Sequence, residues 1–391
     1  MQRSTKKLTG TAAVLASMSL VLAGCAASGE AGGGEPGESI YPDAQGECNV
    51  EPREGVDFDT AVSIIESYQT EPDRLVVTEP LPEPIDPGTT VAFLNNGTAV
   101  AGLMWSFIEP AAQAAGVQIS NVSTGADAQS INSALNTVVE TAPDIVLGVG
   151  LDPSFYIDQL GVLEEQGTVI VSASITNAED FGLLDSFGGR GASEENGRVL
   201  AAAAVSRTCG VGQEFVFYHV PEFPFSHVQL AATQEFLPEI CEDCNLRVVE
   251  LPVATLDTTA ADAVISDLQA HPETQYFVTP ADQIQIGMQS KQELAGIDVH
   301  GMGQSSLPPN VEQIANGLQD AGFAVDFDMF MWLLIDEGIR RHQGADVSYD
   351  DWATMNPLLS QVLTAENADD YKEGFVAYPG FKDKFLELWG K

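Results

Sequence analysis

The sequence predicts an α/β fold of two doubly wound lobes, each with a parallel sheet, joined by a hinge. Short apolar runs alternate with helix-like segments at nearly constant intervals, in two successive series. Runs such as "DIVLGVG" and "TVIVSAS" lack polar alternation, as strands do when they are buried on both faces. The chain also has 391 residues, which is more than one compact core usually organises.

The composition indicates a folded and strongly acidic protein. Hydrophobic residues make up 44% of the chain, which is enough for a sizeable core. The chain has 16 Lys and Arg against 57 Asp and Glu, for a net charge of -41. Such a chain repels nucleic acid phosphates and anionic lipid head groups, so neither is expected as a partner. The acidity favours solubility, including in a saline habitat.

The N-terminus has the pattern of an export signal. A basic start, "RSTKK", precedes an apolar segment from Thr11 to Gly24 that is too short to span a bilayer comfortably. The segment runs into "LAGC", which resembles the lipobox of bacterial lipoproteins. This resemblance implies a signal peptide over residues 1–24 and lipid on Cys25. An ordinary secretory signal beside a chance cysteine is the alternative. Lipid would be the only anchor, on the outer face of the bacterial cytoplasmic membrane.

Two segments are expected before the first lobe. Residues 25–52 are rich in Gly, Glu, Ser and Pro, which predicts a flexible tether. Residues 53–88 form an N-terminal extension, in which "DFDTAVSIIESYQ" has helical spacing of its apolar residues. The prolines of "EPLPEPIDPG" then end any helix.

The first lobe is predicted over residues 89–186. Its strand-like runs begin near Thr89, Val117, Asp144 and Thr168. The helix-like segments between them are Leu103–Ala115, Asp127–Thr141 and Ser154–Gln166. Gly116 and Gly167 follow two of these helices, as C-caps do. Strand, helix and strand at this spacing form the βαβ unit, whose strands are parallel.

The second lobe, over residues 190–324, repeats the pattern. The joint "DSFGGRGASEENG" has glycines that suit a hinge or crossing strand. A long helix-like segment, Ser193–Arg207, comes next. Strand-like runs follow near Glu214, Asn245, Thr274 and Asp298, with helix-like segments at Ser226–Ile240, Thr259–Ala270 and Asp282–Ala295.

The end of the chain is expected to return to the first lobe. A strand-like piece at Gly322–Val325 precedes a helix with an apolar side. We interpret residues 325–352 as a return to the first lobe, the alternative being one more βα unit. Residues 353–391 are expected to pack on the lobes.

Three segments resemble the type I periplasmic-binding-protein family, in its group of ribose- and galactose-type solute-binding proteins of ABC importers. "VAFLNNGTAVAGLMWSFIEPAAQAAGVQI" resembles the first βαβ unit of these proteins. "SINSALNTVVETAPDIVLGVGLDP" resembles their second helix and third strand. "ISDLQAHPETQYFVTPADQIQIGMQSKQELAGIDVHGMGQ" resembles their helix, "HP" turn, Asp-bearing strand end, next helix and strand. The resemblance covers residues 89–344.

The resemblance implies a monomeric binding protein that closes its two lobes on a small ligand and presents the closed form to an ABC permease. It implies no enzymatic activity, no cofactor and no metal. In this fold ligands bind at the carboxyl ends of strands, in the cleft between lobes. The candidate ligand-binding residues at these ends are Asn95, Asn96, Thr98, Asp152, Ser174, Phe223, Phe225, Asp282, Gln283 and Gln304.

Several of these candidates have an alternative explanation. Amides both donate and accept hydrogen bonds, which suits a neutral polar ligand, but Asn-Gly is also a strong turn sequence. Phe223 and Phe225 either stack on an apolar face of the ligand or pack locally. Asp282 either binds the ligand or caps a helix.

The strand ends depart from those of sugar-binding members. These members usually carry aromatic residues after the first strand-end amide, where this chain has Ala99 and Val100. They carry Asp-Arg after the fourth strand, where this chain has Ser174 and Ile175. The strand ends supply no cation, which disfavours an anionic ligand. We therefore expect a small neutral ligand, sugar-like or less polar than a simple hexose.

Four cysteines remain besides Cys25: Cys48, Cys209, Cys241 and Cys244. An even number in an exported chain predicts two disulfides, with three pairings open. The Cys241-Glu-Asp-Cys244 stretch is either a structural bridge or a redox pair, although no aromatic residue or proline frames it. The spacing is not that of a four-cysteine zinc site.

Two other functions compete with the binding protein. An exported hydrolase is disfavoured because the sequence has no Gly-x-Ser-x-Gly, no His-Glu-x-x-His and no phosphate-binding loop. His227 near Glu222 would be its general base, or else the start of a surface helix. A sensory ligand-binding lipoprotein that partners a receptor kinase would share every residue argued above.

Overall fold

A computed structural model describes residues 39–391, apart from residues 44, 126–127, 348, 350 and 373. The predicted signal peptide, the lipidation site Cys25 and the first part of the tether lie outside the described residues. Within the described residues, no helix is both long and apolar enough to cross a bilayer.

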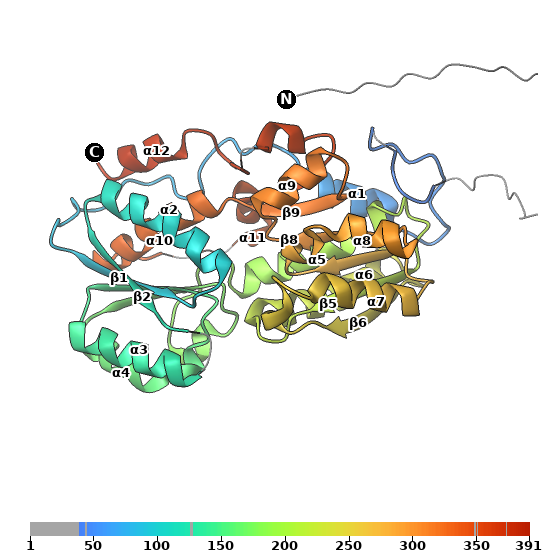
Figure 1. Ribbon diagram of the computed structural model, residues 1–391. Coiled ribbons are helices and arrows are strands. Elements are labelled where there is room, and N and C mark those ends of the chain that lie inside the picture. The colour runs from blue at the N-terminus through green and yellow to red at the C-terminus, as the bar shows by residue number, and fades with distance from the viewer. Residues whose placement is uncertain (1–38, 44, 126–127, 348, 350, 373) are drawn as a thin grey trace, which may run out of the picture. The chain divides into compact units, whose positions relative to one another are not determined.

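The first sheet has four parallel strands in the order β2-β1-β3-β4 (Figure 1). The strands are β1 (Thr90–Asn95), β2 (Gln118–Ser123), β3 (Ile145–Val149) and β4 (Val169–Ala173). The chain builds the sheet in opposite directions on either side of the β1–β3 boundary. This boundary is the topological switch point, where doubly wound folds place ligands.

Helices cover both faces of the first sheet (Figure 1). Val91 and Phe93 point to the face covered by α2 (Ala99–Ala115) and α10 (Phe327–His342). Ala92 and Leu94 point to the opposite face, covered by α3 (Ala128–Thr141) and α4 (Ile157–Glu165). The alternation follows from the two-residue period of a strand, and burial on both faces explains why the sequence shows no polar alternation. Two short 3₁₀ turns, η1 (Pro153–Phe155) and η2 (Ala178–Phe181), follow β3 and β4.

The second sheet has six strands in the order β10-β9-β8-β7-β5-β6. They are β5 (Glu214–His219), β6 (Asn245–Glu250), β7 (Tyr276–Thr279), β8 (His300–Gln304), β9 (Ala321–Val325) and β10 (Ser360–Thr364). Strands β5 to β9 are parallel, whereas β10 runs antiparallel to β9. The predicted class of two doubly wound α/β lobes is confirmed, with β10 as an antiparallel edge that the sequence did not predict.

Helices also sandwich the second sheet. Phe215 and Phe217 face a layer that contains α1 (Phe58–Ser67), α5 (Arg190–Ser206) and α6 (Pro224–Ile240). The opposite layer contains α7 (Ala260–Ala270) and α8 (Met288–Ala295), and α9 (Pro308–Ala315) packs against β9 and β10. The 3₁₀ turns η3 (Val253–Thr255) and η4 (Asp282–Gln285) lie beyond β6 and β7.

The chain passes between the sheets more than once. It leaves the first sheet after β4 to enter α5, and it returns from β9 to α10, which packs on α2, β3 and β4. After α10 it runs through α11 (Trp352–Met355) and η5 (Asn356–Leu358) to β10, back in the second sheet. The last elements are η6 (Ala368–Tyr371) and α12 (Phe381–Leu388), and α12 packs on α10.

Gly197 does not serve the hinge that the sequence suggested for its segment. It lies inside α5, where a Cβ atom would come within 2.4 Å of the Gln229 carbonyl oxygen on α6. Its role is the close approach of two buried helices.

Two disulfides join the four described cysteines. Cys48–Cys209 links the N-terminal segment to the end of α5 across 161 residues, and Cys241–Cys244 spans only 3. Loop-closure entropy assigns roughly 5 kcal/mol to the long bridge and roughly 2 kcal/mol to the short one. The long bridge therefore supplies most of the covalent constraint.

Candidate functional site

A cavity of about 170 Å³ lies where the carboxyl ends of the two sheets come together. It is lined by residues near the ends of β1, β3, β8 and β9 and by the segments that follow β4, β5, β6 and β7. Helices α2, α5, α6 and α10 contribute further walls, together with η5 and the start of β10. The position is that expected for a ligand site in doubly wound sheets.

Most of the predicted residues line this cavity. They are Asn96, Thr98, Ser174, Phe223, Phe225, Gln283 and Gln304. They come from both lobes and from positions more than a hundred residues apart in the sequence.

Three predicted residues do not line the cavity. The Asn95 Oδ1 atom accepts a hydrogen bond from the Gly97 amide at 2.9 Å, as the turn alternative predicted. Asp152 caps η1, where its Oδ1 atom accepts from the Ser154 amide at 2.8 Å. Asp282 is fully buried behind the cavity wall, so it neither lines the cavity nor caps a helix.

The Asp282 carboxyl is a buried hub for hydrogen bonds. It accepts from Ser306 Oγ at 2.5 Å, from Gln285 Nε2 at 2.6 Å and from Gln319 Nε2 at 3.0 Å. Burial raises the pKa of Asp282 to about 7, although these donors favour the charged form. The network ties η4 to the segment after β8, so Asp282 supports the cavity wall from behind.

Asn96 and Thr98 form a small hydrogen-bonded unit at the start of α2. The Asn96 Oδ1 atom accepts from the Thr98 amide at 3.1 Å and from Thr98 Oγ1 at 2.8 Å. Thr98 Oγ1 in turn accepts from the Ala101 amide at 3.2 Å and caps the helix. These bonds orient the Asn96 side chain and occupy its oxygen, so its Nδ2 group is the part suited to donate to a ligand.

Ser174 and Ser305 occupy matching positions in the two lobes, one residue beyond β4 and β8. Both have left-handed backbones, with φ of 55° and 66°. The Ser174 amide donates to the Phe187 carbonyl at 2.7 Å, and the Ser305 amide donates to the Phe323 carbonyl at 2.8 Å. Left-handed conformations of residues other than glycine are uncommon and cluster at ligand sites. Both serines line the cavity.

Three buried amides of the cavity were not predicted: Asn196 on α5, Gln229 on α6 and Asn356 at the start of η5. Asn356 Nδ2 donates to Asn196 Oδ1 at 2.7 Å and to the Tyr68 hydroxyl at 3.1 Å. These residues lie on helices and on a returning segment rather than at strand ends. For Asn196 and Gln229, a polar residue on an otherwise apolar helix face was the signal that could have indicated them.

Gln229 carries the clearest unmet hydrogen bond of the cavity. Its side chain is fully buried, and its Nε2 group donates to Gln304 Oε1 at 2.6 Å. Its Oε1 atom is buried without a hydrogen-bond partner in the described part of the chain. Buried polar atoms are nearly always paired, so this acceptor is suited to a donor on a ligand.

The aromatic residues after β5 pack on each other and also line the cavity. The Phe223 and Phe225 rings stack on each other, with centroids 5.0 Å apart and planes 21° apart. Both also line the cavity. Phe93, Met104 and Phe330 bring apolar surface from the first lobe, so the cavity is mainly apolar with polar groups at chosen points.

The described lining of the cavity has no Lys, Arg or His, and Asp257 is its one ionisable residue. Asp257 Oδ1 accepts from Gln283 Nε2 at 3.2 Å. Without a cation the lining offers an anionic ligand no charge partner.

Two other features bear on metal binding and on the general base considered for a hydrolase. The one cluster of His, Cys, Asp or Glu with metal-like spacing is Cys241, Asp243 and Cys244, and its sulfurs are joined in a disulfide. His227 Nε2 lies 2.8 Å from the Pro221 carbonyl, which can only accept, so this nitrogen carries a proton. The Nε2 atom is therefore not the nitrogen that accepts a proton from a neighbouring group.

Together, the two sheets, the crossing segments and the cavity at the strand ends define the type I periplasmic-binding-protein fold. Solved structures bear this out. An ABC transporter solute-binding protein from Burkholderia graminis C4D1M, in complex with D-arabinose, is similar with a TM-score of 0.62 and 14% identity, over 73% of this chain and 99% of that protein. One from Bacillus halodurans C-125, with bound myo-inositol, is similar with a TM-score of 0.61 and 15% identity, over 74% and 99%.

The same fold occurs in a second class of protein. A putative LacI transcriptional regulator from Bacteroides fragilis is similar with a TM-score of 0.61 and 16% identity, over 73% of this chain and 99% of that protein. No protein-family model and no curated protein matches the sequence. At these identities the similarity shows the fold, and the ligand has to be argued from the cavity.

Proposed function

We propose that this chain is an extracytoplasmic solute-binding lipoprotein of an ABC importer, and that it captures a small neutral ligand between its lobes. The observation that carries the proposal is a cavity lined from both lobes by amides, hydroxyls and aromatic rings, without a cation. The fold supports it, because the similar solved structures include solute-binding proteins with bound D-arabinose and myo-inositol. The absence of a paired nucleophile and base in the described lining favours binding over catalysis.

The lining favours a ligand that has both polar and apolar surface. The lining carries amides from both lobes, and the unpaired Gln229 Oε1 atom is suited to a hydroxyl or N–H donor. It also carries Phe223, Phe225 and Met104, which suit apolar surface. A deoxygenated sugar has both features, and it is less polar than a simple hexose.

Binding would close the lobes by a simple physical mechanism. Gln283 and Gln304 come from the second lobe, and Asn96 and Thr98 come from the first. A ligand that bonds to both sets stabilises the conformation in which both are within reach, and therefore shifts the population toward it. The closed form would then be recognised by the permease.

The ligand class is tested by mass spectrometry of small molecules that co-purify with the folded protein, followed by calorimetry. The panel comprises hexoses, pentoses, deoxy sugars, inositols and sugar acids. We expect a neutral member to bind, and we expect each sugar acid to bind at least tenfold more weakly than its neutral counterpart. Tight binding of a sugar acid would overturn the proposal that the ligand is neutral. Tight binding of a common hexose would overturn the proposal that the ligand is less polar than a hexose.

The importer and the anchor are tested separately in the native host. Cross-linking of the ligand-bound protein in membranes should capture a permease, whereas capture of a receptor kinase would favour the sensory alternative. Intact mass of the membrane-extracted protein should show lipid on residue 25. An unmodified protein would leave the binding function but remove the lipoprotein assignment.

A further inference from the structure

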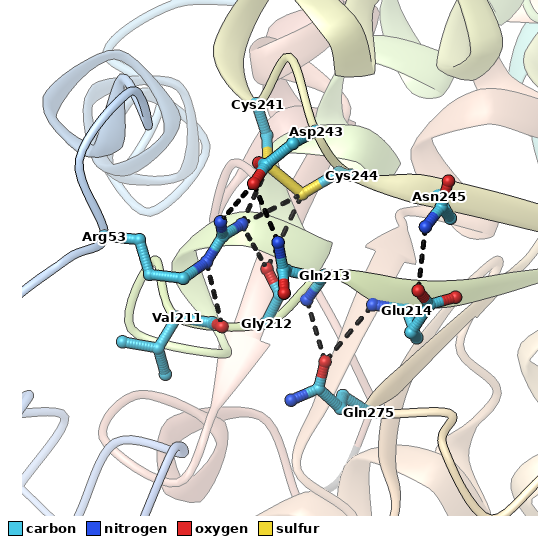
Figure 2. A network of polar contacts seen from close by, with 10 residues as sticks. All are labelled: Arg53, Val211, Gly212, Gln213, Glu214, Cys241, Asp243, Cys244, Asn245 and Gln275. Carbon is cyan, nitrogen blue, oxygen red and sulfur yellow. Dashed lines mark hydrogen bonds and ion pairs between the residues drawn. A yellow bond between two sulfur atoms is a disulfide. The ribbon is translucent and has the colours of Figure 1, made fainter.

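The short disulfide Cys241–Cys244 has a cation held against both of its sulfurs (Figure 2). Arg53 Nη2 lies 3.4 Å from Cys241 Sγ and 3.7 Å from Cys244 Sγ. Arg53 belongs to the N-terminal extension, 188 residues from Cys241 in the sequence. The contact is therefore made by the tertiary structure and not by the local turn.

The Arg53 guanidinium is held in place by several partners. Its Nε atom donates to the Val211 carbonyl at 3.1 Å, and its Nη2 atom donates to the Gly212 carbonyl at 3.1 Å. Its Nη1 atom pairs with Asp243 Oδ2 at 2.7 Å. The backbone of Val56, three residues on, forms a bridge with Cys241. A cation that is fixed in this way needs no rearrangement to stabilise negative charge on sulfur.

The two sulfurs differ in access and in surroundings. Cys241 ends α6 and is buried, whereas Cys244 precedes β6 and is partly exposed. Asp243 Oδ1 lies 3.6 Å from Cys241 Sγ, where it becomes an acceptor once the sulfur carries a proton. A bridge between residues so close in sequence constrains the unfolded chain far less than Cys48–Cys209 does. The constraint that this bridge places on the unfolded chain therefore explains little of why Arg53 and Asp243 lie against its sulfurs.

We propose that Cys241–Cys244 is a site of thiol–disulfide exchange with a dithiol, in which Arg53 stabilises the thiolate of Cys241. A thiolate of the dithiol attacks the accessible Cys244 sulfur. The Cys241–Cys244 bond breaks, and its electron pair stays on Cys241 beside Arg53 as a thiolate. The second thiolate of the dithiol then attacks its own sulfur in the mixed disulfide and releases Cys244 as a thiolate. The dithiol leaves as a disulfide, and this chain has gained two electrons and, as its thiolates are protonated, up to two protons.

The charges of Asp243 and Arg53 have opposite effects on a thiolate at Cys241. Variants of the two residues can therefore be told apart by experiment. The Arg53 cation lowers the free energy of the nearby thiolate, and the Asp243 carboxylate raises it. Both residues contribute to one ion pair, so removing either one loosens the turn. A purely structural role therefore predicts shifts of the same sign for the two variants, and an electrostatic role predicts opposite signs.

The test is a redox titration of the purified full-length protein at pH 8, in buffers of reduced and oxidised glutathione. Alkylation and peptide mass spectrometry report each cysteine pair, and tryptophan fluorescence reports the fold. We expect Cys241–Cys244 to open while Cys48–Cys209 stays closed and the protein stays folded. Arg53→Gln should shift the equilibrium about tenfold toward the disulfide, which is a midpoint about 30 mV more negative. Asp243→Asn should shift it the other way.

Arg190→Gln is the matched control, because Arg190 is largely exposed and its ion pair with Glu194 is remote from these sulfurs. It should leave the midpoint unchanged. Opening of Cys241–Cys244 only on unfolding would overturn the proposal. Shifts of the same sign for Arg53→Gln and Asp243→Asn would overturn the role of Arg53. Stopped-flow reduction by dithiothreitol and by a reduced thioredoxin-type protein identifies the source of the dithiol, since a protein partner should react faster at equal concentration.

Discussion

At the scale of single residues, the hydrogen bonds that each amide side chain already makes determine which groups the cavity offers to a ligand. The Asn96 oxygen is occupied by Thr98, and the Gln304 oxygen by Gln229, so both side chains are oriented before any ligand arrives. Only the Gln229 Oε1 atom is both buried and unpaired among the amides of the described lining. Pre-oriented groups lose little conformational entropy on binding, and an unpaired acceptor gains the most from a ligand donor.

Gln229→Met should weaken ligand binding by roughly tenfold or more, because one hydrogen bond is lost from a buried site. The free energy of unfolding should change by less than about 1 kcal/mol, because an unpaired carbonyl is removed together with one hydrogen bond. Calorimetry with the ligand and denaturant titration measure the two effects. Gln159→Met is the matched control, since Gln159 is also buried with an unpaired Oε1 atom but lies outside the cavity. Equal binding loss in both variants would contradict the assigned role.

At the scale of elements, the contact between α5 and α6 links the packing of the second lobe to the cavity. Gly197 on α5 meets the Gln229 carbonyl on α6, and Thr233 Oγ1 donates to the Gly197 carbonyl at 3.0 Å. The same two helices carry Asn196 and Gln229 into the lining. The spacing between the helices therefore sets the distance between these cavity amides.

Gly197→Ala should destabilise the protein by about 1–3 kcal/mol, because the new methyl group forces the two helices apart. It should also weaken ligand binding, because Gln229 moves with α6. Gly102→Ala is the control, since Gly102 is helical and exposed, and a Cβ atom added there would meet no atom within 4 Å. It should stabilise the protein by about 0.5–1 kcal/mol. Thermal unfolding of both variants gives the comparison, and equal melting temperatures would contradict the packing argument.

At the scale of the whole molecule, buried carboxyls join segments that are distant in the sequence. Asp282 ties η4 to Ser306 and Gln319, and Asp326 accepts from the Met329 and Ala377 amides. Glu337 on α10 accepts from Ser186 Oγ at 2.7 Å and from the Tyr349 hydroxyl at 3.2 Å, and so holds two crossing segments together. Burial raises the pKa of Asp282, Asp326 and Glu337 to about 7 in each case.

The protein should become less stable as the pH rises from 5 to about 7. Between the ordinary carboxyl pKa and about 7, the native state keeps protons that the unfolded chain has released, so unfolding releases protons and is favoured at higher pH. Each carboxyl contributes up to about 1.4 kcal/mol per pH unit within this window. Burial lowers the pKa of His219, which opposes the trend at the acidic end only.

Urea unfolding at several pH values, in low and in high salt, checks this dependence. The trend should persist in high salt, since salt screens repulsion between surface acids but not the desolvation of buried carboxyls. Asp282→Asn should flatten it, because one of the titrating groups is removed. A stability that rises steadily from pH 5 to about pH 7 would contradict the raised pKa values.

The sequence alone was informative where the signal is local. The apolar run before Asn95, the regular spacing of strands and the glycine at position 116 after α2 all reflect backbone geometry, so the two lobes could be predicted. Asn96, Ser174 and Gln304 could be placed near the site because they follow strands, and strand ends converge in this fold. Asp282 also follows a strand, yet it faces the interior, because the direction of a side chain after a strand depends on the loop that follows.

By itself, the sequence determined the alternation of strands and helices, the cation-free strand ends and the even number of cysteines after Cys25. These depend on composition and on short-range periodicity, which a single chain displays directly. Only the tertiary structure decided the cysteine pairing, the antiparallel strand β10 and the burial of the Asp282 side chain. It also decided the contacts of Gln229 with Gln304 and of Arg53 with Cys241. Each of these joins residues that become neighbours only when the whole chain packs, and no local pattern encodes the distance between them.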